Sequence, residues 1–134
     1  MTSILPKVSP DAAVGHVVDS DAVLAFNCTA HRRGHGTMSY PTKVFEALGA
    51  GRPILAIPPD GDWVDALLAR TRGGVTAATS LDTAAVLDRW LSEWSVGGIA
   101  YAPDAEQVAA LSTLRQTARL ASFLSSLAPT RSSQ

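Results

Sequence analysis

The stretch Ser39-Tyr-Pro-Thr-Lys-Val-Phe-Glu-Ala-Leu-Gly-Ala-Gly-Arg-Pro-Ile-Leu-Ala-Ile57 decides the fold of this 134-residue chain. Pro41 is typical of the first turn of a helix, and Gly51 suits the left-handed position just beyond a helix end. The apolar run at 53–57 then predicts a buried strand. A helix that ends in a tight turn and leads directly into a buried strand is typical of a β-α-β unit, so the stretch predicts a parallel sheet.

Helices and strands are expected to alternate on both sides of this stretch. Ser9 precedes Pro10 and Asp11 as the N-cap of a first helix, and Ser80 is expected to cap a later one. The predicted order is helix 10–19, strand 21–27, helix 41–49, strand 53–57, helix 63–70, strand 75–77, helix 81–95 and helix 104–127. Strands 21–27 and 53–57 are expected to be buried. Trp90 and Trp94 are assigned to the core because they lie one helical turn apart on an apolar stripe, and the last helix is expected to bury Leu114 and Leu124 if it packs.

The pattern predicts an α/β fold, a three-layer Rossmann-like parallel sheet with flanking helices. Residues 1–128 form a single domain and residues 129–134 a frayed tail. Only three strands are expected, which is half of a doubly wound domain. The chain therefore looks too short for a complete enzyme. Its sheet has an open edge, which either a partner domain or subunit would cover, or a second copy of the chain, forming a homodimer.

Composition excludes several classes of function. The formal net charge of -1 gives no electrostatic footprint for nucleic acid. Cys28 is the single cysteine and cannot form an internal disulfide. No run of about 18 apolar residues exists, so no transmembrane segment is expected. We expect a cytoplasmic protein whose contact with a membrane, if it has one, is peripheral.

The helix that follows residues 28–40, a predicted loop, carries the candidate chemistry. The first turn of a helix presents free backbone N–H groups and a positive dipole end, so Thr42 and Lys43 are candidates to hold a diphosphate. Glu46 lies three residues after Lys43 on the same side of the helix, and its carboxylate can accept two hydroxyl hydrogen bonds from a ribose. Ser39 and Thr42 are candidates for helix capping as well as for phosphate contact.

The loop before this helix is cationic. Arg33 lies there with His31, Arg32 and His35, and these side chains are candidates for a phosphate-binding lip. Solvated loop residues are the alternative. Two histidines without a third nearby ligand do not make a metal site, so no metal is expected.

The segment Pro41-Thr-Lys-Val-Phe-Glu-Ala-Leu-Gly-Ala-Gly-Arg-Pro-Ile-Leu55 resembles the P-x-K-x-x-E-x-x-A-x-G-x-P-V motif of family 4-like glycosyltransferases. The stretches Ser20–Ala25 and Gly73–Thr76 resemble the sequences on either side of that motif, so the resemblance covers about residues 12–95. It implies the C-terminal part of a GT-B fold that binds a UDP-, GDP- or TDP-sugar as donor substrate, with no further cofactor. It implies that Glu46 contacts the ribose. The other candidates for contact with the donor nucleotide are Lys43, Thr42, Pro41, Ser39 and Arg33.

Two departures from that family matter. Many members carry another glutamate eight positions earlier, where this chain has Met38. Members also supply an Arg and a Lys to the diphosphate from earlier strands, and an acceptor-binding domain precedes those. Sugar transfer would thus require an acceptor domain or partner subunit, and no catalytic residue is assigned. The alternatives are a non-catalytic remnant or interaction module with a GT-B-like fold, and a fragment of a nucleotide-sugar epimerase.

Overall fold

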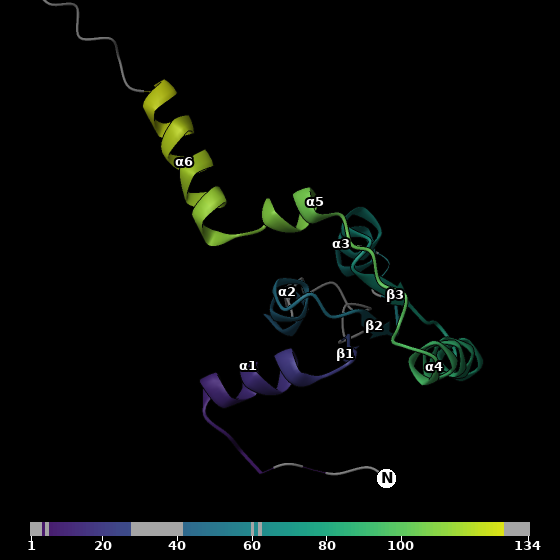
Figure 1. The fold of residues 1–134 in the computed structure, drawn as a ribbon. Coiled ribbons are helices and arrows are strands. Elements are labelled where there is room, and N and C mark those ends of the chain that lie inside the picture. Colours follow the sequence, from purple (N-terminus) through teal and green to yellow (C-terminus); the bar gives the residue numbers. More distant parts are fainter. Residues whose placement is uncertain (1–3, 5, 28–41, 60, 62, 128–134) are drawn as a thin grey trace, which may run out of the picture.

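The computed structural model describes residues 4, 6–27, 42–59, 61 and 63–127. The elements in chain order are α1 (Pro10–Asp19), β1 (Val23–Phe26), α2 (Thr42–Gly49), β2 (Ile54–Ile57), α3 (Trp63–Thr71), β3 (Gly74–Thr76), α4 (Ser80–Ser95), α5 (Ala105–Ala109) and α6 (Thr113–Leu127). Figure 1 shows the sheet at the centre, with α4 and α6 at opposite ends of the molecule.

The three strands form one parallel sheet in the order β1-β2-β3. The register pairs Val23 with Ile54 and Ile54 with Gly74, so β2 is hydrogen-bonded on both sides. The crossovers from β1 to β2 and from β2 to β3 contain α2 and α3 respectively. The predicted α/β fold with a small parallel sheet is therefore confirmed, and it is compatible with a Rossmann-like arrangement.

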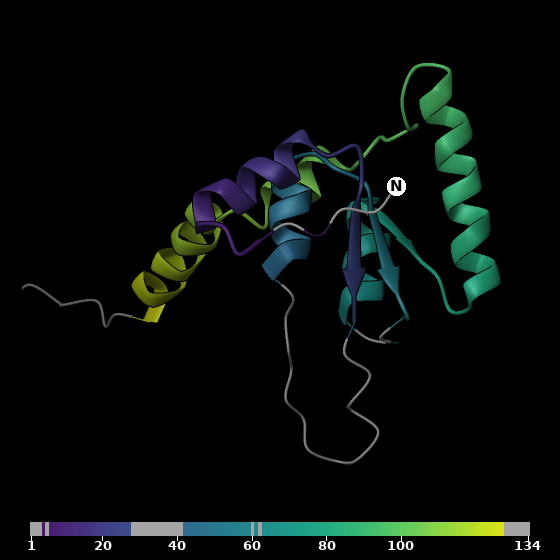
Figure 2. The ribbon, with the colours of Figure 1, turned by 90° about the horizontal axis from the view of Figure 1, so that it is seen from below.

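Helices cover both faces of the sheet, each over its own apolar core. Ile54 and Ala56 pack with α2 and α3 on one face, where α1 and α5 add partly buried residues. Leu55 points to the other face and packs with Trp90 of α4. Figure 2 shows this layering, with α4 on one side of the strands and α1 and α2 on the other. Alternate residues of β2 thus face opposite cores, as strand geometry requires.

Local sequence signals account for most helix ends. Ser9 Oγ accepts a hydrogen bond from the Ala12 amide at 3.3 Å, as predicted for the N-cap of α1. Gly51 has a φ of 68°, which is the left-handed conformation predicted after α2. The predicted N-cap of α4, Ser80, is wrong by one residue. The N-cap is Thr79, which forms a reciprocal capping box with Asp82.

The prediction that β1 is buried is wrong for one of its faces. Ala25 is buried in the core beneath α2, but Leu24 is exposed on the opposite face and 75% of Phe26 is accessible. The reason is positional, since β1 lies at the edge of the sheet while α4 packs over Leu55 and Val75 of the other two strands. An apolar run shows that a strand can be buried, but it does not show whether a neighbouring layer covers it.

The predicted last helix is broken in two, and its second half does not pack. Asp104 caps α5 and its amide donates to the Thr71 carbonyl at 2.8 Å, which ties α5 to the end of α3. A turn at 110–112 then separates α5 from α6. All residues of α6 are exposed, including Leu114 at 81% and Leu124. The condition that this part of the helix packs is therefore not met, and these leucines are not buried.

The two tryptophans of α4 differ in the same way. Trp90 packs on Leu55 and is buried, whereas Trp94 is 55% exposed. The assignment of Trp94 to the core is wrong, because α4 continues past the small sheet.

Replacing Gly74 with alanine tests the close approach of β2 and β3. A Cβ at this position would collide with the Ile54 carbonyl oxygen and lie 2.8 Å from its carbon. Because backbone atoms cannot yield as side chains do, we expect Gly74→Ala to lower the free energy of unfolding by about 3 kcal/mol. Urea denaturation measures this change.

Gly49→Ala is the matched control. A Cβ on Gly49 meets no atom within 4 Å. We expect this helical substitution to leave stability unchanged or to raise it by about 0.5–1 kcal/mol. Equal stability of the two variants would contradict the close strand contact.

Candidate functional site

The candidate site lies at the carboxyl edge of the sheet, where the strands end at Phe26, Ile57 and Thr76. α2 runs antiparallel to the strands, because it ends at Gly49 shortly before β2 begins. Its N-terminal end therefore lies at the carboxyl edge, and Figure 2 shows that end on the same side as the strand arrowheads. Open α/β sheets bind ligands at this edge, and a helix N-terminus there favours anions.

Polar groups between the first two strands stabilise this edge. The Asn27 amide donates to the Ile57 carbonyl at 2.8 Å, and the Asn27 side-chain Nδ2 donates to the Pro58 carbonyl, also at 2.8 Å. The Gly61 amide donates a hydrogen bond to Oδ2 of Asp65 at 2.8 Å. Asp65 lies in the first turn of α3. These bonds fix the backbone around the site, and the role of Asp65 is structural.

Three of the predicted ligand residues, Thr42, Lys43 and Glu46, are brought together on α2. All three are exposed, whereas the buried stripe of this helix is formed by Val44, Ala47 and Leu48. Residues three apart on a helix are neighbours, so Lys43 and Glu46 share one side of α2. The other predicted contacts, Arg33, Ser39 and Pro41, lie outside the described residues.

Neither Lys43 nor Glu46 forms an ion pair within the part of the chain that the structure describes. The ion pair found there joins Arg89 Nε and Glu93 Oε1 at 3.8 Å, on α4. A lysine in the first turn opposes the helix dipole, and the first turn of α2 holds no acidic residue that offsets this cost. An ammonium and a carboxylate are thus both presented to solvent near the carboxyl edge.

An aromatic pair beside these charges was missed by the sequence predictions. Phe45 of α2 and Trp63, the first residue of α3, have ring centroids 5.2 Å apart with planes tilted by 52°. Phe45 is 37% exposed, so part of its ring is accessible next to Glu46. The apolar spacing puts Phe45 on one stripe with Val44 and Leu48, but the structure places it on the flank of the buried stripe. Its partner could be found only from the packing of α2 with α3.

Two apolar hollows lie on the described surface, and neither is lined by Lys43 or Glu46. One, of about 290 Å³, is formed between Phe45 and Leu48 of α2 and the region of Val108 and Leu111. The other, of about 310 Å³, lies beside α4. The residues described bring no three potential metal ligands together.

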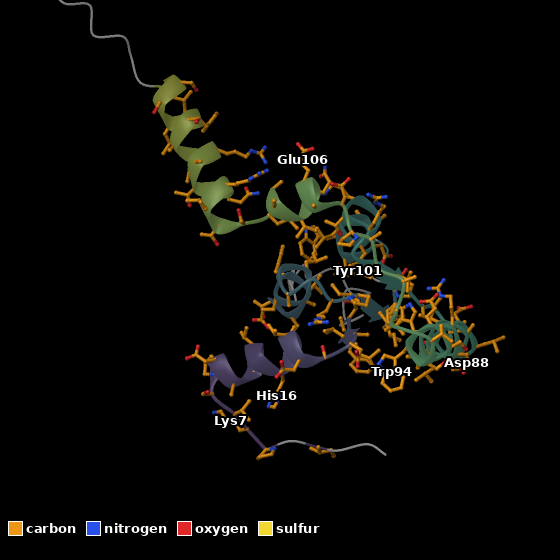
Figure 3. All side chains as sticks on the ribbon, viewed as in Figure 1. Lys7, His16, Asp88, Trp94, Tyr101 and Glu106 are labelled. Carbon is orange, nitrogen blue, oxygen red and sulfur yellow. The ribbon has the colours of Figure 1, made fainter. Side chains whose placement is uncertain are left out.

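Tyr101 is a buried polar group remote from the α2 terminus. Burial raises the pKa of its phenol above 10.0, and its hydroxyl has no hydrogen-bond partner in the described parts of the protein. Figure 3 shows Tyr101 between the α3 and α4 regions. The residue lies in the segment that leads from α4 to α5, and it is no part of the candidate site.

Comparisons with known protein families, with curated proteins and with solved structures found no match. The resemblance to glycosyltransferases thus stays a prediction from the residues of this chain. Among the described segments, no helix combines the length and the apolar character needed to span a bilayer.

Tyr101→Phe tests the unpaired hydroxyl. At neutral pH we expect unfolding free energy to stay equal or to rise by about 1 kcal/mol, because the variant removes a buried polar group that gains no bond. A loss of stability at neutral pH would show that the hydroxyl has a partner.

The pH dependence supplies a second readout of the same variant. A raised pKa in the folded state means that folding favours the neutral phenol, so its contribution to stability is complete below pH 10.0 and is lost as pH rises through the folded-state pKa. Chemical denaturation at alkaline pH should show a smaller decline for Tyr101→Phe than for the parent.

Proposed function

We propose that this chain is the nucleotide-sugar donor-binding domain of a glycosyltransferase. The observation that carries the proposal is the placement of Lys43 and Glu46 together on the exposed side of α2, whose N-terminal end lies at the carboxyl edge of a parallel sheet. A cation at a helix N-terminus and a carboxylate one turn later match the two polar parts of a nucleoside diphosphate.

Each group has a separate task in the proposed complex. The N-terminal amides of α2, with Thr42 and the Lys43 ammonium, bind the diphosphate oxygens, where helix dipole and full charge act in the same direction. The Glu46 carboxylate accepts hydrogen bonds from the ribose hydroxyls. Pro41, Ser39 and Arg33 belong to the same proposed donor site, and the exposed part of Phe45 provides an apolar surface beside it.

The proposed chemistry is transfer of the sugar to an acceptor hydroxyl: the bond between sugar and diphosphate breaks, the acceptor oxygen forms the new glycosidic bond, and the hydroxyl proton is released to solvent. Negative charge develops on the diphosphate as its bond to the sugar breaks, so the cations and amides that hold it also stabilise the transition state. A donor site provides one of the two substrates. The proposal therefore includes an acceptor-binding domain or subunit, which would also complete the diphosphate clamp.

A non-catalytic interaction module is the second candidate, and the uncovered face of β1 favours it. Leu24 and Phe26 are both exposed there, which suits association more than small-molecule binding. This candidate predicts a folded chain that binds none of the nucleotides.

The decisive experiment is calorimetric titration of the chain with UDP, GDP and TDP and their sugars. We expect one nucleotide series to bind, and Glu46→Gln to weaken it by roughly tenfold, because losing charge-assisted hydrogen bonds costs about 1.5 kcal/mol. The base that binds identifies the donor.

Glu106→Gln is the matched control, since Glu106 is an exposed glutamate on α5, a different element from α2. Its affinity should equal that of the parent. Absence of binding at millimolar nucleotide, by protein shown to be folded, would reject the donor site and favour the interaction module.

A further inference from the structure

The face of the sheet beneath α4 is only partly covered. α4 packs over Leu55 and Val75 of the inner strands, while Leu24 and Phe26 of the edge strand are exposed on this face. The apolar groove of about 310 Å³ lies between α4 and the start of β1. The described residues that line it are Asp21, Ala22, Leu87, Trp90, Leu91, Trp94 and Ile99. In α/β domains a second helix normally occupies such a position beside the first.

Among the described segments, α6 is a helix that buries none of its residues. α6 is 15 residues long and exposed along its whole length. Leu120, Phe123, Leu124 and Leu127 recur at intervals of three and four, which is the spacing of a packing stripe. Arg115 and Ser122 lie on the opposite side, whereas Arg119 flanks the stripe one turn before Phe123. Such a helix gains most of its stability from packing of its apolar face, so α6 requires a partner surface.

α6 cannot reach the groove of its own chain in this structure. α6 follows α5, which packs against α3 on the other face of the sheet. Figures 1 and 2 both show α6 projecting from the body at the end opposite to α4. A helix from a second copy is not subject to this constraint.

Length and charge both fit α6 to the groove. α4 has 16 residues and α6 has 15, so the two helices extend for about 24 and 22 Å and can lie side by side.

All 12 acidic residues lie within positions 1–106, whereas α6 carries Arg115 and Arg119 and no acid. Asp21 lines the groove and Asp88 belongs to α4, whereas Glu93 of α4 is paired with Arg89. A pair of α6 helices would instead bring like charges together, and an approach of the acidic body to an anionic lipid surface would be repelled.

We propose that two copies of this chain exchange their C-terminal helices, with α6 of each copy docked along α4 and over β1 of the other. The exchange is reciprocal, so the interface closes as a two-fold dimer and both copies bury the same surfaces. The inference does not rest on the donor site. It also goes beyond an interaction module by naming the partner and both contact surfaces.

Sedimentation equilibrium of the full chain tests the proposal. We expect a mass twice that of the 14.0-kDa chain. Leu124→Glu in α6 and Leu91→Glu in α4 should each raise the dimer dissociation constant at least about tenfold, because each places a charge inside an apolar contact. Both leucines are exposed, so neither change removes a core residue.

The matched controls introduce the same charge on the outer side of each helix. Ser122→Glu in α6 and Ala85→Glu in α4 affect exposed positions away from the apolar stripes and should leave the dimer intact. Circular dichroism checks that all four variants are folded.

Disulfide trapping distinguishes helix exchange from other dimers. Two proteins are mixed under oxidising conditions, one with Leu124→Cys and the other with Leu91→Cys, both carrying Cys28→Ser. Cross-links between the two different proteins in high yield, and lower yield for either protein alone, are expected.

Four results would each overturn the proposal. They are a monomer at all concentrations; a dimer that resists both glutamate substitutions; a dimer disrupted by Leu124→Glu but not by Leu91→Glu, which indicates pairing of α6 helices; and a monomer that binds phosphatidylserine vesicles through α6.

Discussion

Burial of β2 on both faces is the constraint on which the rest of the structure depends. Ile54, Leu55 and Ala56 are completely inaccessible, and both edges of the strand are hydrogen-bonded. A strand that is apolar on both faces needs a layer on each side, and parallel neighbours need helical crossovers. On one face, α2 and α3 are the crossover helices and also form the covering layer. On the other face the requirement is met by α4, through the contact of Trp90 with Leu55.

The same constraint fixes the candidate site. Because the crossover helices return antiparallel to the strands, their N-terminal ends must lie at the carboxyl edge. Val44, Ala47 and Leu48 anchor α2 to the sheet, which leaves Lys43 and Glu46 on its accessible side. The packing that stabilises the core is thus also what orients the charged residues.

Elements and site residues could be predicted where the signal is local. The cap at Ser9 and the left-handed Gly51 each depend on a few neighbouring residues, and the structure confirms both. Whether an apolar surface is covered by another element cannot be predicted from neighbouring residues in the sequence. The exposure of Phe26, Trp94 and Leu114 depends on which element lies opposite in space, and the apolar character of these residues is the same in either case. The pairing of Phe45 with Trp63 was missed for the same reason.

The apolar groove beside α4 lies on a surface distinct from the candidate site. The groove is lined by Asp21 and Ala22, which precede β1, by Trp94 near the end of α4 and by Ile99 beyond it, so it belongs to the amino edge of the sheet. Lys43 and the N-terminal end of α2 lie at the carboxyl edge. A helix that fills the groove therefore leaves the α2 terminus accessible, and association does not compete with ligand binding for the same surface. Covering β1 in this way would also restrain Asn27, which joins the end of that strand to Pro58 beside the candidate site.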